Sequence, residues 1–397
     1  MKIGVDIRVL MDEHYSGISE YTANLLTAIL RQNGVLSGSA ADKPDDYRLF
    51  YNSFHDLRAR LAPWAGNNKS QLIGTRWPNK LFNYFLQKFC SWPKLDQVLG
   101  GVDIFWSPHF NFTSLSSGSK APLKISTVHD LSFLRYPEFF SARKNFWHRA
   151  LDVKKILRAA DKIVAVSENT KNDVIELVGI AAEKIQVIYP GNNIKKEEIS
   201  AVADEKLKEK YRLSDNFILY VGNIEPRKNI LGLIEAFNAL RTTSASKPED
   251  RFKNLQLVLA GGTGWKNKKI YHAWQKSLYK NDIKFLGYIN ENEKAVLYSQ
   301  ATVFAYPSFY EGFGFPPLEA MTYGLPVVCS NVSSLPEVVG NAALTINPFK
   351  SEEIADALEK MLTDDNLRAD FIARGYERIK LFSWDKTAVE YLKLFKN

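Results

Sequence analysis

The stretch FILYVGNIEPRKNILGLIEAF, residues 217–237, decides the fold of this chain. Its first five residues are all apolar, which is typical of a strand that is covered on both faces of a parallel sheet. A short turn that carries Arg227 and Lys228 follows, and from Ile230 onward apolar residues recur at the spacing of one helix face. A buried strand, a short turn and a helix in this order predict one unit of a parallel α/β sheet.

The same alternation of short apolar runs and helical patterns continues on both sides of this stretch, and it predicts two α/β domains with parallel sheets. The predicted strands cover residues 2–7, 47–51, 103–106, 124–129, 162–166, 186–189, 217–221, 255–260, 283–286, 302–306 and 327–329. The predicted helices cover residues 18–31, 142–160, 169–178, 230–240, 317–323 and 352–362, with a last helix after Ser383.

The length of the chain also favours two domains, because 397 residues exceed what one hydrophobic core usually serves. A polar, charged stretch from Asn192 to Asp215 interrupts the alternation, which restarts at Phe217. We therefore predict a first domain, a linker, a second domain and a terminal helix. Their boundaries are residues 1–195, 196–215, 216–380 and 381–397.

The composition is that of an ordinary globular protein, with 45% hydrophobic and 24% charged residues. Its two cysteines, Cys90 and Cys329, lie far apart and predict neither a disulfide framework nor a zinc site. The first residues resemble a strand rather than a signal peptide, and no run reaches the roughly 18 apolar residues of a membrane span. We expect a cytoplasmic protein that is either soluble or bound to the inner face of the membrane.

Arg227 and Lys228 follow a buried strand and precede a helix, which places two cations at the carboxyl edge of a parallel sheet. Open α/β sheets bind their ligands at this edge. The N-terminus of the following helix adds free N–H groups and a positive dipole, so a diphosphate fits such a site. Alternatively, the two charges are incidental to a solvated turn.

The stretch YEGFGFPPLEAMTYGLPVV, residues 310–328, combines a glycine loop with two carboxylates. Gly312 and Gly314 carry no Cβ, so their backbone N–H groups can approach a ligand closely. Glu311 precedes this loop and Glu319 lies in the helix that follows, and each carboxylate can accept hydrogen bonds from vicinal hydroxyl groups. We expect one to bind a sugar ring and the other a ribose. The alternative is an exposed helix glutamate beside ordinary turn glycines.

Two weaker signals lie in the first half of the chain. His129 follows an apolar strand, where it can hydrogen-bond substrate hydroxyls, although a histidine at a strand end is more often structural. Gly17 stands at the entry to a long helix and can offer its backbone N–H to a phosphate. The full G-x-G-x-x-G pattern is missing, so a dinucleotide site is poorly supported.

Together these motifs resemble glycosyltransferase family 4 over nearly the whole chain. The resemblance rests on the Gly17 loop, VHD at residues 128–130, EPRKN at residues 225–229, the Glu-x7-Glu frame from Glu311 to Glu319, and SNVSSLPEVVG at residues 330–340. It implies the GT-B fold, in which two Rossmann-like domains flank a cleft and the C-terminal helix crosses back to the N-terminal domain. It also implies a retaining hexosyltransferase whose first domain binds the acceptor and whose second domain binds the nucleotide-sugar donor.

The resemblance further implies roles for the matching residues. Arg227 and Lys228 would neutralise the donor diphosphate, Glu311 would bind the sugar hydroxyls, Glu319 the ribose, and His129 would contact the sugar near its anomeric carbon. The expected catalytic residues are His129, Arg227, Lys228 and Glu311, and the expected donor-binding residues are Gly17, Gly222, Phe313, Gly314, Phe315 and Glu319. We expect no metal and no cofactor, because fixed cations can stabilise the leaving diphosphate and the nucleotide-sugar is a substrate.

The donor and the acceptor follow less directly from the sequence. Residues 133–140 resemble the mannosyltransferases of the family, so GDP-mannose is the first expected donor, while UDP-glucose, UDP-N-acetylglucosamine and GDP-rhamnose stay open. Aromatic residues and lysines alternate over residues 75–94, as expected for a helix on an anionic membrane surface or for an amphipathic helix packed on its own domain. If this helix binds a membrane, a polyprenyl-diphosphate-linked saccharide is the expected acceptor, in the synthesis of a bacterial polysaccharide or O-antigen.

Two other functions stand as alternatives. A sugar-nucleotide epimerase shares the two-domain fold but would need no acceptor. A nucleic-acid-binding or DNA-glucosylating protein is suggested only by the net charge of +8, and the dispersed basic residues lack the aromatic platform of single-strand binders. We therefore expect no nucleic acid partner.

Overall fold

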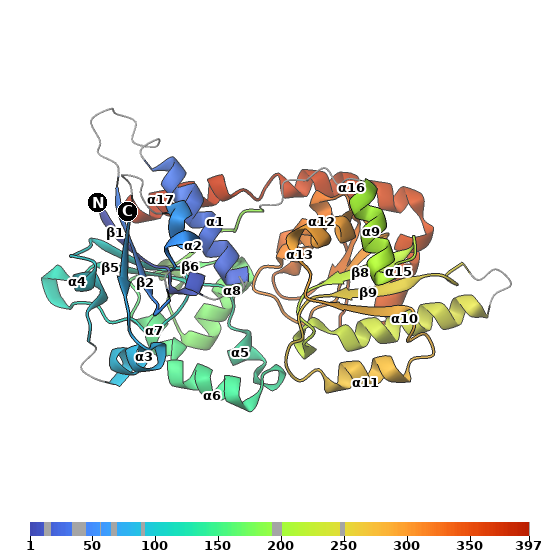
Figure 1. Cartoon of the computed structure of the whole chain (residues 1–397), viewed down its shortest axis with the longest axis horizontal. Coiled ribbons are helices and arrows are strands. Elements are labelled where there is room, and N and C mark those ends of the chain that lie inside the picture. Colours follow the sequence, from blue (N-terminus) through green and yellow to red (C-terminus); the bar gives the residue numbers. More distant parts are fainter. Residues whose placement is uncertain are drawn as a thin grey trace. The chain divides into compact units, whose positions relative to one another are not determined.

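The computed structural model describes residues 1–11, 17–33, 45–55, 57–64, 70–88, 92–192, 201–246 and 251–396. The chain divides into two compact units, and each unit is built from more than one segment. The first unit comprises Met1–Leu131, Phe146–Asn193 and Phe382–Asn397, and the second unit comprises Ser132–Asn145 and Ile194–Leu381. Each unit contains a parallel sheet with helices on both of its faces (Figure 1).

In the first unit, the described residues form seven parallel strands in the order β3-β2-β1-β4-β5-β6-β7. The strands are β1 (Lys2–Asp6), β2 (Asp46–Asn52), β3 (Ser70–Thr75), β4 (Ile104–Ser107), β5 (Leu123–Val128), β6 (Lys162–Ala165) and β7 (Ile185–Val187). The accompanying helices are α1 (Gly17–Gln32), α2 (Arg58–Leu61), α3 (Asn79–Lys88), α4 (Leu95–Val98), α6 (Ala142–Leu151) from Phe146 onward, α7 (Val153–Arg158), α8 (Glu168–Asp173) and α17 (Trp384–Lys396).

In the second unit, the described residues form six parallel strands in the order β10-β9-β8-β11-β12-β13. The strands are β8 (Phe217–Val221), β9 (Gln256–Ala260), β10 (Ile283–Gly287), β11 (Val303–Tyr306), β12 (Val327–Ser330) and β13 (Leu344–Ile346). The accompanying helices are α5 (Ser132–Arg135), α9 (Ala201–Tyr211), α10 (Ile230–Ala245), α11 (Lys268–Lys276), α12 (Glu291–Gln300), α13 (Phe315–Thr322), α14 (Leu335–Val339), α15 (Ser351–Thr363) and α16 (Asp365–Ile379).

The predicted buried strand over residues 217–221 is confirmed as β8. All five of its residues are buried, and it pairs with β9 on one side and β11 on the other. Because these strands are parallel, the residues that follow β8 and β11 come to the same edge of the sheet. This edge therefore positions the candidate site.

The predicted terminal helix is confirmed as α17, and it belongs to the first unit, where it packs along α1 (Figure 1). The hydroxyl of Tyr391 on α17 lies 2.8 Å from that of Tyr21 on α1 and 2.7 Å from Oγ1 of Thr127 on β5. The indole N–H of Trp106 on β4 donates to the same Thr127 oxygen at 3.0 Å. The last helix thus returns to the N-terminal sheet, as the GT-B fold requires, whereas the cleft between the domains stays a prediction.

Two segments differ from the sequence prediction in their assignment. Residues 132–145 belong to the second unit rather than to a first domain over residues 1–195. The predicted linker over residues 196–215 contains helix α9, in which Leu207 is buried and the Tyr211 hydroxyl donates to Glu293 at 3.1 Å. Alanine, lysine and glutamate are strong helix formers, so this polar composition marks an exposed helix.

Three other elements also differ from the prediction. The predicted single helix over residues 142–160 is divided into α6 and α7 at Asp152, which has a φ of +49° and caps α7 by accepting from the Lys155 N–H. Strands β3 and β13 were not predicted, and both lie at an edge of their sheet.

Among the helices in the described ranges, none is long and apolar enough to cross a membrane.

Candidate active site

The site is built around an ion-pair cluster at the carboxyl edge of the second sheet. Arg227 and Lys228 lie on a short 3-10 turn directly after β8, and Glu311 lies between β11 and α13. Lys228 Nζ donates to Glu311 Oε1 at 2.6 Å, and an Arg227 amino group donates to Glu311 Oε2 at 3.1 Å. The structure therefore brings together three of the four predicted catalytic residues, in the same unit.

Burial makes this cluster electrostatically strong. The exposed fractions of Glu311 and Lys228 are 6% and 8%, and Lys228 also donates to the Tyr306 hydroxyl at 2.8 Å. Burial alone would raise the pKa of Glu311, but the charges of Lys228 and Arg227 outweigh it and lower that pKa to about 2. Burial lowers the pKa of Lys228, against the opposing effect of Glu311. Glu311 is thus a carboxylate at any physiological pH.

A second carboxylate, Glu225, belongs to the same cluster and was not singled out from the sequence. Its Oε1 accepts from Arg227 Nε at 3.2 Å and from an Arg227 amino group at 3.1 Å. The Tyr310 carbonyl also accepts from Arg227, at 2.8 Å. The spacing of Glu225 and Arg227 inside EPRKN could have indicated this ion pair, because the side chains of residues two apart in a turn can point the same way.

The glycine loop before α13 is fixed by the segment that follows β12. The hydroxyl of Ser334 donates to the carbonyls of Glu311 at 3.0 Å and Phe313 at 2.8 Å, and Ser333 accepts from the Glu311 N–H at 3.0 Å. Gly314 has a φ of +105°, and a Cβ there would lie 2.6 Å from Leu335. Only glycine therefore suits this position at the start of α13.

Glu319 lies on α13 and makes contacts of its own, separate from those of Glu311. Its Oε2 accepts from the Tyr298 hydroxyl at 2.8 Å, and its Oε1 lies 3.6 Å from Lys294 Nζ. Phe313 is buried in the loop before α13, and Phe315 is the first residue of that helix. Gly222 ends β8 with a φ of +150°, and a Cβ there would lie 2.7 Å from the Tyr220 hydroxyl.

The other two predicted residues, His129 and Gly17, belong to the first unit. His129 follows β5, and its Nε2 lies 2.7 Å from the Pro108 carbonyl, which can only accept, so Nε2 carries the proton. Burial lowers the pKa of His129 to about 4, although Pro108 and Asp130 oppose this. The ring is neutral at pH 7, and Nδ1 is its acceptor. Gly17 is the first residue of α1, and, apart from its chain neighbours and the backbone of its own helix, no atom of the described residues lies within 4 Å of the place that a Cβ would take there.

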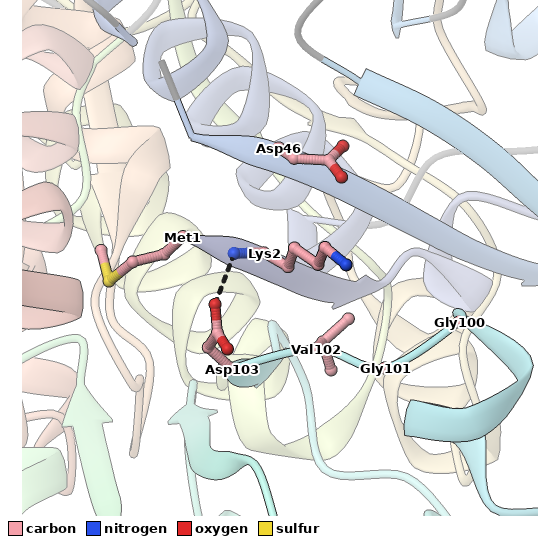
Figure 2. Close-up of a pocket in the computed structure, with 7 residues that line it drawn as sticks. All are labelled: Met1, Lys2, Asp46, Gly100, Gly101, Val102 and Asp103. Carbon is pink, nitrogen blue, oxygen red and sulfur yellow. Dashed lines mark hydrogen bonds between the residues drawn. The ribbon is translucent and has the colours of Figure 1, made fainter. Parts of the chain in front are cut away.

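A pocket of about 520 Å³ in the first unit lies at the other edge of its sheet (Figure 2). Met1, Lys2, Asp46 and residues 100–103 line it, and they stand at or just before the amino ends of β1, β2 and β4. The carboxylate of Asp103 already has a hydrogen-bond partner, because it accepts from the Lys2 N–H at 2.8 Å. Open α/β sheets bind ligands at the carboxyl edge, so this pocket is not part of the candidate site.

Comparison with known proteins agrees with this geometry. The family pattern described as "Glycosyl transferases group 1" matches residues 203–378, and that described as "Glycosyltransferase Family 4" matches residues 17–196. O-antigen chain mannosyltransferase B of Escherichia coli is 34% identical over 68% of this chain and 70% of its own length. The serotype-specific mannosyltransferase WbdA of Escherichia coli is 32% identical over 72% of this chain, but the match spans only 35% of that longer protein.

The solved structure of HepE from Anabaena, in complex with UDP and glucose, has the same fold. It covers 100% of both chains with a TM-score of 0.71 and 18% sequence identity. Two parallel-sheet units and a last helix that returns to the first unit agree with the GT-B fold. The two family patterns and the 34% identical relative show the family. The chain therefore belongs to glycosyltransferase family 4.

Proposed function

We propose that this protein transfers mannose from GDP-mannose to a saccharide acceptor, with retention of configuration, in the synthesis of an O-antigen-type polysaccharide. The observation that carries the proposal is the buried cluster of Arg227, Lys228 and Glu311 at the carboxyl edge of the second sheet. The similarity to E. coli O-antigen mannosyltransferases supports mannose as the sugar.

In this proposal the cluster exchanges its partners when the donor binds. Arg227 and Lys228, now paired with Glu311, turn their N–H groups to the diphosphate and stabilise the charge that develops on it as the glycosidic bond breaks. The Glu311 carboxylate is then free to accept hydrogen bonds from the sugar hydroxyls. Glu319, oriented by the Tyr298 hydroxyl, accepts from the ribose.

The proposed chemistry is a same-face attack without a metal. The departing phosphate oxygen takes the proton of the acceptor hydroxyl, and the new bond forms on the face that the phosphate leaves. Full activity after dialysis against EDTA would support metal independence, and an α-linked product from an α-linked donor in NMR would support retention. A covalent mannosyl-enzyme in mass spectrometry would contradict the same-face attack.

A thermal-shift screen against GDP, UDP and ADP tests the donor. A ligand that binds only the folded protein raises its melting temperature, by an amount that grows with the ratio of ligand concentration to Kd. We expect the largest shift with GDP. A larger shift with UDP would favour the second candidate, a UDP-sugar-dependent transferase, which is supported by the fold shared with the HepE complex that contains UDP. The absence of a shift with all three would contradict the proposed function.

We also propose that the acceptor is lipid-linked and that α3 brings the protein to the cytoplasmic membrane surface. Phe82 and Leu86 of this helix are buried in the core of the first unit, whereas Leu81 and Tyr84 are each 50% exposed. Trp92, shortly after the helix, is 53% exposed. An apolar row beside basic residues is the composition of an interfacial helix.

Co-sedimentation with anionic vesicles tests this second proposal. The variant Leu81→Ser plus Tyr84→Ser should lose binding, whereas Leu278→Ser, which alters a leucine that is 90% exposed in the second unit, should keep it. Equal binding by the double variant and the wild type would contradict a role for α3.

A further inference from the structure

The segment 132–145, which follows the His129–Asp130 motif, is anchored to the second unit by a set of aromatic and polar contacts. The indole N–H of Trp265 donates to the Phe139 carbonyl at 2.7 Å, and Lys266 Nζ donates to the Glu138 carbonyl at 2.7 Å. The rings of Phe140 and Trp265 stack with centroids 5.6 Å apart. The segment also stacks Phe139 on Phe309 at 5.7 Å and sets Tyr136 edge-on to Tyr310 at 5.8 Å. It is therefore held against the loop that leads into Glu311.

At the end of this segment, the ammonium group of Lys144 lies against the face of the Trp265 ring. Its Nζ lies 3.1 Å from the centroid of the Trp265 ring. Within the described ranges, the ammonium group of Lys144 makes no hydrogen bond or ion pair, and the Lys144 side chain is half-buried. An aromatic face attracts a cation without accepting its N–H groups in the way an oxygen does. The ring therefore holds the ammonium in place and leaves its N–H donors available to a ligand.

Lys144 stands beside the ion-pair cluster. Trp265 follows Gly264, and a Cβ on that glycine would lie 2.8 Å from the Ile224 carbonyl oxygen and 3.0 Å from Glu225 Cβ. Burial lowers the pKa of Lys144, while the nearby charge of Glu225 raises it and that of Arg227 lowers it. The charges of Glu225 and Arg227 thus act on the Lys144 ammonium group.

The cluster itself carries no excess charge. Glu225 and Glu311 contribute two negative charges, and Arg227 and Lys228 contribute two positive charges, all buried or nearly so. A neutral cluster gives a diphosphate no net attraction, so binding it in a desolvated site requires a further cation. One carboxylate oxygen, Oε2 of Glu225, is buried without a hydrogen-bond partner among the described residues. The cluster therefore has no positive charge in excess for a diphosphate.

We propose that Lys144 binds a phosphate oxygen of the substrate and is the additional cation that the neutral cluster needs. This inference rests on the proposed function. The shared ligand chemistry is a diphosphate, which can come from the nucleotide-sugar donor or from a prenyl-diphosphate-linked acceptor. Lys144 itself lies outside the motifs on which the family resemblance rests, so it adds a binding residue to the site.

The test compares Lys144→Met with two matched variants in the full-length protein. Lys144→Arg keeps a cation that stacks on the Trp265 ring. Lys266→Met removes the neighbouring lysine, whose Nζ is already used by the Glu138 carbonyl. Isothermal titration with GDP and GMP should show about a tenfold weaker Kd for GDP in Lys144→Met, a smaller loss for GMP, and wild-type affinity in the other two variants.

A second measurement separates the two sources of the diphosphate. Two acceptors carry the same oligosaccharide, one on a prenyl diphosphate and the other on a neutral alkyl chain. If Lys144 serves the acceptor, Lys144→Met keeps the GDP affinity but raises KM about tenfold for the diphosphate acceptor alone. Either result supports a phosphate-binding Lys144. Should Lys144→Met lower the melting temperature, Lys144→Gln replaces it.

The proposal is overturned if Lys144→Met keeps both the GDP affinity and the KM for the diphosphate acceptor, or if Lys266→Met shows the same losses. These outcomes are distinct from failure of the proposed function. A wild-type protein that binds none of GDP, UDP and ADP contradicts the function itself, whereas wild-type binding with an unaffected Lys144→Met contradicts only the role of Lys144.

Discussion

At the residue scale, two glutamates of the glycine loop and its helix occupy different electrostatic environments. Glu311 is paired with Lys228 and Arg227, whereas Glu319 accepts from the neutral Tyr298 hydroxyl with Lys294 at 3.6 Å. Removing the charge of Glu311 takes away the ion-pair partner of Lys228 and leaves Arg227 paired with Glu225. Removing the charge of Glu319 instead makes its side chain a weaker hydrogen-bond acceptor for the Tyr298 hydroxyl. The two positions should therefore respond differently to the same isosteric substitution.

We predict that Glu311→Gln lowers kcat about a hundredfold and leaves the Kd for GDP unchanged or tighter, because the Glu311 carboxylate no longer competes with the diphosphate for Arg227 and Lys228. Glu319→Gln should weaken GDP binding about tenfold and largely keep kcat. Steady-state kinetics with GDP-mannose and titration calorimetry with GDP measure both effects. An equal loss of nucleotide affinity in the two variants would show that this division of roles is wrong.

A second residue-scale prediction concerns the protonation of His129. Its pKa is lowered to about 4, so the folded state holds the neutral ring at pH values where the unfolded chain, with a pKa near 6.5, binds a proton. The stability from the neutral ring is therefore fully present above about pH 6.5 and is lost as the pH falls toward 4.

We expect NMR to show the His129 ring neutral with its proton on Nε2 from pH 8 down to about pH 5. Comparison with His129→Gln assigns the signal, and this variant should lose less stability between pH 6.5 and pH 4 than the wild type. A His129 signal that titrates near pH 6.5 would contradict the buried, neutral ring bonded to Pro108.

At the element scale, the turn that carries the two cations depends on how α10 begins. Asn229 adopts a left-handed conformation with a φ of +55°, its Oδ1 accepts from the Gly232 N–H at 3.2 Å, and its Nδ2 donates to the Pro348 carbonyl at 2.7 Å. One buried side chain thus caps the helix and ties it to the loop after β13. Asparagine tolerates the left-handed region better than most residues with a Cβ.

We predict that Asn229→Ala destabilises the protein by about 2–4 kcal/mol, because it removes the cap and the bond to Pro348 and because alanine tolerates the left-handed backbone less well than asparagine. Asn229→Gly also loses both bonds, but glycine adopts the left-handed conformation without strain, so it should cost less. Urea unfolding followed by tryptophan fluorescence ranks the two variants. A smaller loss in Asn229→Ala than in Asn229→Gly would refute this account of the turn.

The strands and helices differ in how well the sequence pattern predicts them. Central strands such as β8 are buried on both faces, so an unbroken apolar run revealed them. The two missed strands, β3 and β13, lie at sheet edges, where partial exposure admits polar residues such as Gln71 and Thr345. The helix break at Asp152 also escaped prediction, because the apolar spacing continues across it and only the backbone conformation marks the end.

Some residues of the candidate site could likewise be predicted from the sequence, and others could not. Arg227, Lys228 and Glu311 were predicted together because they flank strands whose ends must meet at one edge. Glu225 was missed, since its role depends on how the Arg227 guanidinium folds back, which no spacing rule describes. The contact of Lys144 with Trp265 could not be predicted either, because it joins segments more than a hundred positions apart in the sequence.

At the scale of the whole molecule, the chain returns to its first unit through the last helix. Trp384, Tyr391, Leu392 and Phe395 of α17 are buried there, and Tyr391 closes a chain of polar contacts with Tyr21, Thr127 and Trp106. A buried polar chain of this kind is stable only while every member keeps a partner. The stability of the first sheet therefore depends on residues near the C-terminal end of the sequence. The strands of the second unit contribute no residue to this polar network.

We predict that Tyr391→Phe destabilises the first unit by about 1–3 kcal/mol, because the Tyr21 and Thr127 hydroxyls then lose a buried partner. Hydrogen exchange should quicken at the amides of α1 and β5 and stay unchanged at those of β8 and β11, which separates a local effect from general loosening. Glu390→Gln is the matched control, since its exposed ion pair with Lys393 on the same helix contributes little. Faster exchange in β8 and β11 as well would mean that α17 stabilises both units, and unchanged exchange in β5 would show that the Tyr391 hydroxyl is dispensable.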